Sequence, residues 1–179
     1  MAQEKMTLFY EETDVFSNWF MEDFVDGNNV KFNCSEQAMM YYKAQMFGDE
    51  ETAQKIMMAK HPSRQKALGR EVKNFNSAKW DAVSRHVVYR ACWFKFRNSP
   101  LLMKEILATA GTTLVEASDK DVLWGVGLSK DNPLIYDRKN WRGKNWLGQV
   151  LTQLRFDFII GNSLLWDNEN WIAVDVEFE

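Results

Sequence analysis

The stretch SAKWDAVSRHVVYRACWFKF, residues 77–96, decides the fold class of this 179-residue chain. Apolar side chains recur within it at spacings of three and four residues, at Trp80, Val83, Val87, Ala91 and Phe94. Because an α-helix turns once every 3.6 residues, this spacing places them on one face. The sequence therefore predicts a long helix that begins after Ser77 and packs this face against the core.

Four further helices are expected around the long one. The run SEQAMMYYKAQMF, residues 35–47, has Ser35 as a helix cap and Gly48 as a stop. A short helix over about residues 51–60 ends before Pro62, which disfavours helical geometry at the residue before it. Pro100, after Asn98 and Ser99, starts the next helix, which Gly111 ends, and a last amphipathic helix covers about residues 145–160.

The extended segments are short. Met6, Leu8 and Tyr10 alternate, and Phe24 and residues 30–32 flank turn residues 26–29, which predicts a small hairpin. TTLVEA, residues 112–117, is typical of a buried strand, and alternation over residues 172–178 predicts a closing strand. The length suits one domain, residues 1–179, with enough chain to bury one core.

Composition excludes several classes of protein. A net charge of −3 and a pI near 5.5 argue against non-specific wrapping of nucleic acid, which needs many cations on phosphates. There is no apolar run of about 18 residues and no signal-peptide layout, so we expect no membrane contact and a cytoplasmic location. Two cysteines, Cys34 and Cys92, provide neither a disulfide framework nor a zinc cluster, and we expect no metal and no cofactor.

Two regions are candidates for a functional site. Residues 118–144 carry Gly, Asn, Asp and Pro without periodicity, and a loop of that length in a compact domain is usually functional. Glu36 falls in the first turn of its helix, where the helix dipole favours an ionised carboxylate able to stabilise positive charge. An acidic residue there is also a common helix-start signal, so both interpretations stay open. Eight Trp and twelve Phe exceed what core filling needs, so some rings are expected to line a pocket.

Other enzyme plans fit the sequence poorly. It has no nucleophile elbow G-x-S-x-G and no catalytic cysteine motif, and the two histidines, His61 and His86, lie in isolation. It also lacks the glycine fingerprints of P-loop and dinucleotide-binding folds.

An ordered set of motifs resembles the NADAR superfamily, the YbiA-like N-glycosidases. The resemblance spans residues 8–155 and leaves residues 156–179 as a C-terminal extension. The family shows an F-S-N-F/W entry, an S-E helix, an L-G-R turn, a tryptophan-led long helix, a D-x-x-W-G loop and a G-x-N-x-L-G helix start. In this chain the matching segments are FSNWF (16–20), SEQAMMYYKAQ (35–45), ALGR (67–70), VEASDKDVLWGVG (115–127) and WRGKNWLGQVL (141–151), followed by Arg155.

The resemblance implies an α+β fold, mainly helical with a small antiparallel sheet, and hydrolysis of the bond between a ribose and a heterocycle. Such cleavage passes through a cationic, oxocarbenium-like sugar, which needs a carboxylate, a water and a donor for the leaving nitrogen. Glu36 matches the catalytic acidic residue and is expected on the sugar and water side. Asp121 is expected to act as acid or as a ribose anchor, with Asp119 as its competitor, although either can be a solvated loop charge.

The remaining expected site residues bind substrate. Trp124, and Trp80 if it is not simply part of the core, offer faces for stacking a base, a contact of about 1–3 kcal/mol. Lys43, two helical turns after Glu36, is expected on the same face to meet a phosphate. Arg64, Lys66 and Arg70 form a second cationic set, of which Arg70 belongs to a family motif, and surface solvation is the plain alternative for each. Asn18 and Asn145 fall on the family's motif asparagines.

The loop between Trp124 and Trp141 is longer than in the bacterial riboflavin-linked type, and this difference leaves more than one substrate open. Phosphoribosylaminopyrimidine intermediates of riboflavin biosynthesis are the first expectation for a small-molecule substrate. ADP-ribose attached to guanine in nucleic acid is the second, because Lys130, Arg138, Lys139, Arg142 and Lys144 in this region can meet a phosphate backbone. A non-catalytic module that binds ADP-ribose or NAD is the third. The sequence does not give the oligomeric state.

Overall fold

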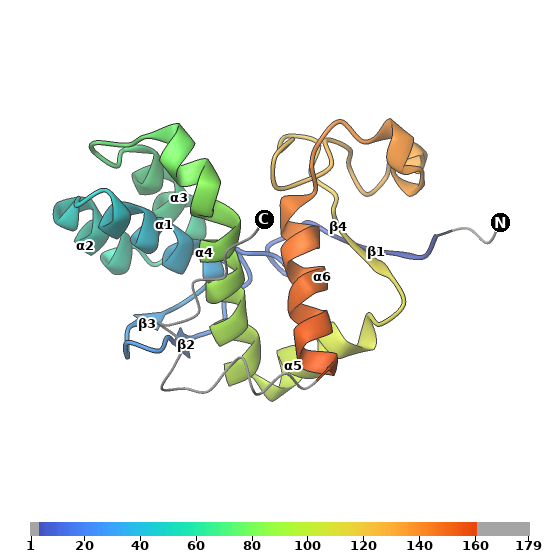
Figure 1. Ribbon diagram of the computed structural model, residues 1–179, viewed down its shortest axis with the longest axis horizontal. Coiled ribbons are helices and arrows are strands. Elements are labelled where there is room, and N and C mark those ends of the chain that lie inside the picture. Colours follow the sequence, from blue (N-terminus) through green and yellow to red (C-terminus); the bar gives the residue numbers. More distant parts are fainter. Residues whose placement is uncertain (1–3, 161–179) are drawn as a thin grey trace.

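The computed structural model describes residues 4–160, which form six α-helices, two short 3-10 helices and two two-stranded sheets (Figure 1). The α+β class expected from the resemblance is confirmed, with helices dominating. In chain order the elements are β1 (Met6–Phe9), β2 (Phe24–Val25), β3 (Lys31–Phe32), α1 (Ser35–Met46), α2 (Glu50–Met58), α3 (Pro62–Arg70), α4 (Ser77–Asn98), α5 (Pro100–Ala108), β4 (Thr113–Glu116), η1 (Pro133–Tyr136), η2 (Arg138–Asn140) and α6 (Trp146–Ile159). None of the helices within these residues combines the length and apolar character needed to cross a bilayer.

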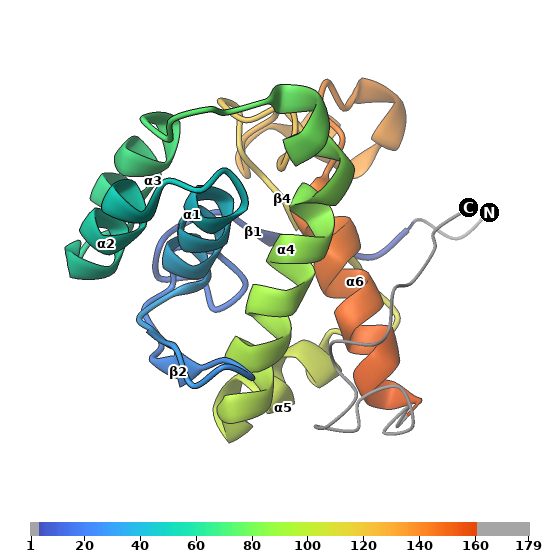
Figure 2. The same ribbon diagram turned by 60° about the vertical axis from the view of Figure 1, so that its left-hand side comes forward.

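Helix α4 is the long helix predicted from residues 77–96, and it stands at the centre of the fold. Figures 1 and 2 show it between α1 on one side and α6 on the other, and it contacts both. The predicted face packs on the core, but its Val83, Val87 and Phe94 are only half-buried. Because neighbours lie on both sides, burial extends around the helix to Val88 and Cys92, which one-face periodicity does not predict.

Helices α1, α3 and α4 differ from the expected ones. Helix α4 begins at Ser77 rather than after it, because Asn76 is its cap. Cys34, not Ser35, caps α1: its side chain accepts from the backbone N–H of Gln37, and Ser35 is the first helical residue. Helix α3 was expected only as a turn around the L-G-R motif, because its nine residues are polar and show little apolar periodicity. Pro62 opens this helix at a position where its missing N–H costs nothing, and the His61 side chain caps it.

The strand pairing corrects the expectation of an antiparallel sheet. The hairpin is confirmed, because β2 and β3 pair antiparallel. Strands β1 and β4, however, pair in parallel, with Phe9 opposite Glu116. Alternation of apolar residues predicts strands but not their direction, and the helices of residues 35–108 provide the long crossover that a parallel pair requires. The expected strand at residues 172–178 lies outside the described residues.

The second half of the expected 118–144 loop is packed rather than irregular. Val126, Leu128 and Ile135 are buried in a small core beside β1 and β4. The indole N–H of Trp141 donates to the carbonyl oxygen of Ile135 at 2.7 Å, and η1 and η2 lie between these contacts. Residues 126–141 are therefore packed in place, and only the first part of the loop, before residue 126, contributes to a site.

Candidate active site

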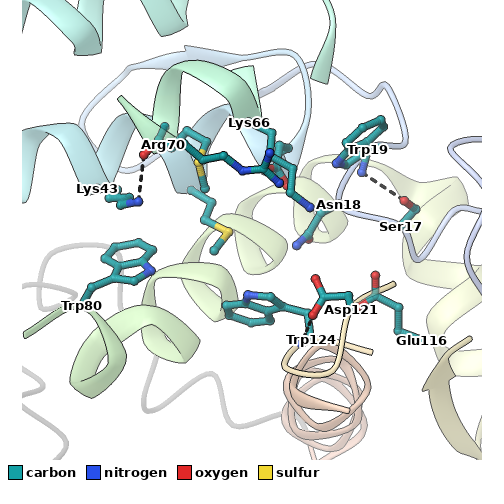
Figure 3. Close-up of a pocket in the computed structure, with 14 residues that line it drawn as sticks. Ser17, Asn18, Trp19, Lys43, Lys66, Arg70, Trp80, Glu116, Asp121 and Trp124 are labelled. Atoms are coloured by element: carbon teal, nitrogen blue, oxygen red, sulfur yellow. Dashed lines mark hydrogen bonds between the residues drawn. The ribbon is translucent and has the colours of Figure 1, made fainter. Parts of the chain in front are cut away.

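One pocket gathers most of the residues that the sequence selected. Figure 3 shows the cationic side chains on one side of the pocket and Trp80, Trp124, Asp121 and Glu116 on the other. The pocket encloses about 200 Å³, several times the roughly 30 Å³ share of one water in the liquid, so it can admit a small organic group. It is lined by Ser17, Asn18, Trp19, Glu36, Met39, Met40, Lys43, Lys66, Gly69, Arg70, Trp80, Glu116, Asp121 and Trp124.

Glu36 lies in the first turn of α1 and is 4% exposed. Its backbone N–H donates to the carbonyl oxygen of Asn18, which ties the helix start to the FSNWF segment. Burial raises the pKa of Glu36 to about 6, and the nearby charge of Asp121 also raises it. The charges of Lys66 and Arg70 and a side-chain hydrogen bond with Trp19 lower this pKa and limit the rise. At neutral pH the group is therefore a buried carboxylate facing a pocket, which a mere helix-start signal would not require.

Asp121 organises the turn that carries Trp124. Its Oδ1 accepts the backbone N–H groups of Leu123 at 2.9 Å and Trp124 at 2.8 Å, and its own N–H donates to Ser118 Oγ. The Trp124 ring packs edge-on against Trp146, with centroids 5.7 Å apart. One oxygen of Asp121 is thus committed to the loop, although the residue lines the pocket as expected. Its competitor Asp119 is exposed and does not line the pocket.

Glu116 is a pocket residue that sequence reasoning missed. Glu116 is the last residue of β4, and the side chain of the preceding Val115 packs into the small second core. Because successive side chains of a strand point to opposite faces, the side chain of Glu116 points into the pocket. Burial raises the pKa of Glu116 to about 8, with Asp121 and Glu36 raising it further and Lys66 lowering it. The available signal was a charged residue at the end of the apolar strand TLVE, directly before the loop singled out as functional.

Three cations form the opposite wall. Lys43 from α1 donates to the carbonyl oxygen of Gly69 at 2.8 Å, and burial lowers its pKa, with Arg70 adding to the effect against Glu36. Lys66 and Arg70 come from α3, one turn apart. Arg64, which the sequence grouped with them, instead lies on the surface near Glu71, at 3.9 Å. The helix that sequence analysis missed therefore supplies two of the three cations.

Trp80 and Trp19 also line the pocket. Trp80 is 7% exposed, belongs to the core cluster and also lines the pocket, so both interpretations of this residue hold together. Trp19, in the FSNWF segment, is a lining residue that was not singled out.

Gly69, another lining residue, lies so close to Met40 that a Cβ at position 69 would approach the Met40 sulfur to 1.9 Å.

The two motif asparagines have different positions. Asn18 points into the pocket (Figure 3), and the Cys92 thiol donates to its side-chain oxygen at 3.7 Å. Asn145 does not line the pocket: its Oδ1 accepts from the N–H of Glu116 at 3.0 Å, and its Nδ2 donates to the carbonyl oxygen of Leu114 at 2.9 Å. It precedes α6 with a left-handed backbone, φ 54°, and holds β4 in place.

Comparison with known proteins identifies the family of this chain. The model of the NADAR domain matches residues 8–158. The chain belongs to the NADAR family. Among its relatives, Protein irg-1 of Caenorhabditis elegans is 39% identical over 163 residues, covering 83% of this chain and 77% of that protein. N-glycosidase R617 of Acanthamoeba polyphaga mimivirus is 38% identical over 145 residues, covering 79% and 85%.

Two further proteins are similar to this NADAR chain: one has a solved structure, and the other is named for riboflavin biosynthesis. The NMR structure of the Escherichia coli protein YbiA superimposes with a TM-score of 0.72 at 28% identity, covering 91% of this chain and 90% of that one. Riboflavin biosynthesis protein PYRR, chloroplastic, of Zea mays is 33% identical over 129 residues, which cover 66% of this chain but 19% of that longer protein.

Proposed function

We propose that the substrate of this N-glycosidase is a small phosphorylated N-riboside, a phosphoribosylaminopyrimidine of riboflavin biosynthesis, cleaved by water at its C1'–N bond. The observation that carries the proposal is the pocket itself, which brings the carboxyl groups of Glu36, Asp121 and Glu116 together with three cations. The names of the relatives, N-glycosidase and riboflavin biosynthesis protein, point to the same chemistry and the same substrate class.

The chemistry assigned to Glu36 follows from its charge and burial. Breaking the C1'–N bond develops positive charge on the ribose, and a carboxylate held in a low-dielectric pocket stabilises that charge more strongly than one in water. With a pKa of about 6, Glu36 is ionised at neutral pH and basic enough to accept a proton from the attacking water. It therefore serves both as electrostatic stabiliser and as general base.

The other walls suit the two ends of such a substrate. Lys43, Lys66 and Arg70 provide positive charge for a 5-phosphate, and guanidinium groups bind phosphate oxygens in pairs. Trp124 and Trp80 offer flat surfaces to a heterocycle.

The ADP-ribosyl-guanine alternative loses part of its support. Of the five cations that motivated it, Lys130 pairs with Asp14 at 2.5 Å, Lys139 pairs with Asp137 at 2.7 Å, and Arg138 pairs with Glu4. These charges hold the 126–141 segment to itself and to the N-terminal region. The alternative is kept as an outcome of the test below.

The test is a direct assay of the purified protein. Incubation with the phosphoribosylamino-pyrimidinone or -uracil is expected to release ribose 5-phosphate, followed by mass spectrometry, and Glu36→Gln protein provides the matched blank. An oligonucleotide carrying ADP-ribosyl guanine is assayed in parallel. Cleavage of the oligonucleotide alone would replace the proposed substrate, and ADP-ribose binding without cleavage of any N-riboside would refute catalysis.

A further inference from the structure

The pocket holds one more carboxyl group than the two that the sequence assigned. Cleavage of an N-riboside requires a proton for the departing nitrogen as well as a carboxylate for the sugar. Glu36 is ionised at neutral pH, and Asp121 uses one oxygen to accept two backbone N–H groups. Neither is therefore suited to hold the proton.

Glu116 differs from both in its hydrogen bonding. Its Oε2 is buried without a hydrogen-bond partner among residues 4–160, and the residue lines the pocket. Its backbone is fixed on both sides, because its N–H donates to Asn145 Oδ1 and its carbonyl oxygen accepts from Val126 N–H, each at 3.0 Å. The backbone that carries the carboxyl group is thus fixed, and Oε2 has no hydrogen-bond partner among the described residues.

The charges around Glu116 favour its neutral form. Asp121 and Glu36 face it with like charge, and Lys66 is the cation that opposes them. The pKa of Glu116 rises to about 8 while that of Glu36 reaches only about 6, so near pH 7 one group carries a proton and the other does not. Two neighbouring titratable groups whose pKa values are shifted apart in this way are typical of a catalytic acid and base.

We propose that Glu116 is the proton donor to the leaving heterocycle, with Asn145 as the residue that positions it. In the step, the Glu116 carboxyl proton moves to the departing nitrogen as the C1'–N bond breaks and its electron pair goes to that nitrogen. Water adds to C1', and its proton passes to the Glu36 carboxylate. Proton exchange with solvent then returns both groups to their starting forms, and the net reaction is hydrolysis.

This inference rests on the proposed function and adds a residue to it. The test compares Glu116→Gln with wild type on two substrates, the phosphoribosylaminopyrimidine and 4-nitrophenyl β-ribofuranoside 5-phosphate, whose leaving group departs without a proton. We expect turnover to fall at least roughly 100-fold on the first substrate and less than about 5-fold on the second. Asp119→Asn, which removes a nearby charge outside the pocket, is the control and should match wild type.

A second measurement follows the proton itself. In protein with ¹³C-labelled glutamate carboxyl groups, the NMR signal absent from Glu116→Gln protein is expected to report a neutral carboxyl at pH 7. An ionised signal at pH 7, or equal losses of turnover on both substrates, overturns the assignment. If wild type cleaves no N-riboside, the proposed function fails instead, whereas wild-type turnover of the aminopyrimidine by Glu116→Gln leaves the function standing and removes Glu116 from it.

Discussion

Replacing Glu36 with Gln should make the protein more stable while making it inactive. Burial raises the pKa of Glu36 from its ordinary 4.5 to about 6, so folding opposes ionisation of this group. At roughly 1.4 kcal/mol per pH unit, keeping it ionised in the folded protein costs about 2 kcal/mol. Gln keeps the size and most of the hydrogen bonding without the charge, and so it removes this cost.

The sign of the effect depends on pH in a defined window. Below pH 4.5 Glu36 is neutral in both the folded and the unfolded protein, so the stabilisation from the substitution vanishes there. As pH rises from 4.5 through about 6, wild type loses stability relative to Glu36→Gln, and above this window the difference is constant. The loss of a helix-dipole contact, roughly 0.3–1 kcal/mol, acts in the opposite direction and is smaller.

The assay combines melting temperature at pH 4 and pH 7.5 with single-turnover rates at pH 7.5. For a protein of this size about 2 kcal/mol corresponds to a gain of roughly 4–8 °C at the higher pH. Turnover should fall at least about 100-fold, the scale for losing a positioned base or a major electrostatic contact. Asp119→Asn controls for the loss of one negative charge. A Glu36→Gln protein that melts lower than wild type at pH 7.5 and turns over normally would refute the reasoning.

Three other substitutions test two pocket residues and one residue that supports β4. Trp124→Ala should raise KM by roughly 5- to 150-fold, because a stacked base contributes about 1–3 kcal/mol, and an unchanged KM would place the base elsewhere. Arg70→Met should weaken binding of the phosphorylated riboside but not of its dephosphorylated form, measured by calorimetry; equal effects on both would contradict a phosphate contact. Asn145→Ala should lower the free energy of unfolding by roughly 1–3 kcal/mol in denaturant melts, because two buried backbone groups lose their partner.

Much of the helical fold and most of the site could be predicted from the sequence. The spacing of apolar residues predicted α4 and α6, because this signal is local in the chain. The family motifs predicted Glu36, Trp80 and Asp121 as site residues, and helical spacing predicted Lys43; the structure brings all four into one pocket.

The missed features depend on contacts that are distant in sequence. The parallel direction of β1 and β4 is set by a crossover, and apolar alternation is identical for either direction. Glu116 escaped notice because its pKa is raised first by burial in the folded protein and then by the charges of Asp121 and Glu36, which are remote in the chain or lie across a turn. Asn145 was expected to bind substrate. Only the folded structure shows that both the oxygen and the nitrogen of its side-chain amide hydrogen-bond to the backbone of β4.

The pairing of β1 with β4 has a consequence for how the protein folds. Phe9 lies opposite Glu116, and its carbonyl oxygen accepts from the N–H of Ala117, so a contact between the two ends of a long segment fixes one wall of the pocket. Closing so long a segment is slow compared with forming the local helices. During synthesis, helices α1 to α5 can therefore form while Glu116 is still unplaced, and a nascent or N-terminally clipped chain would be largely helical yet without an assembled site.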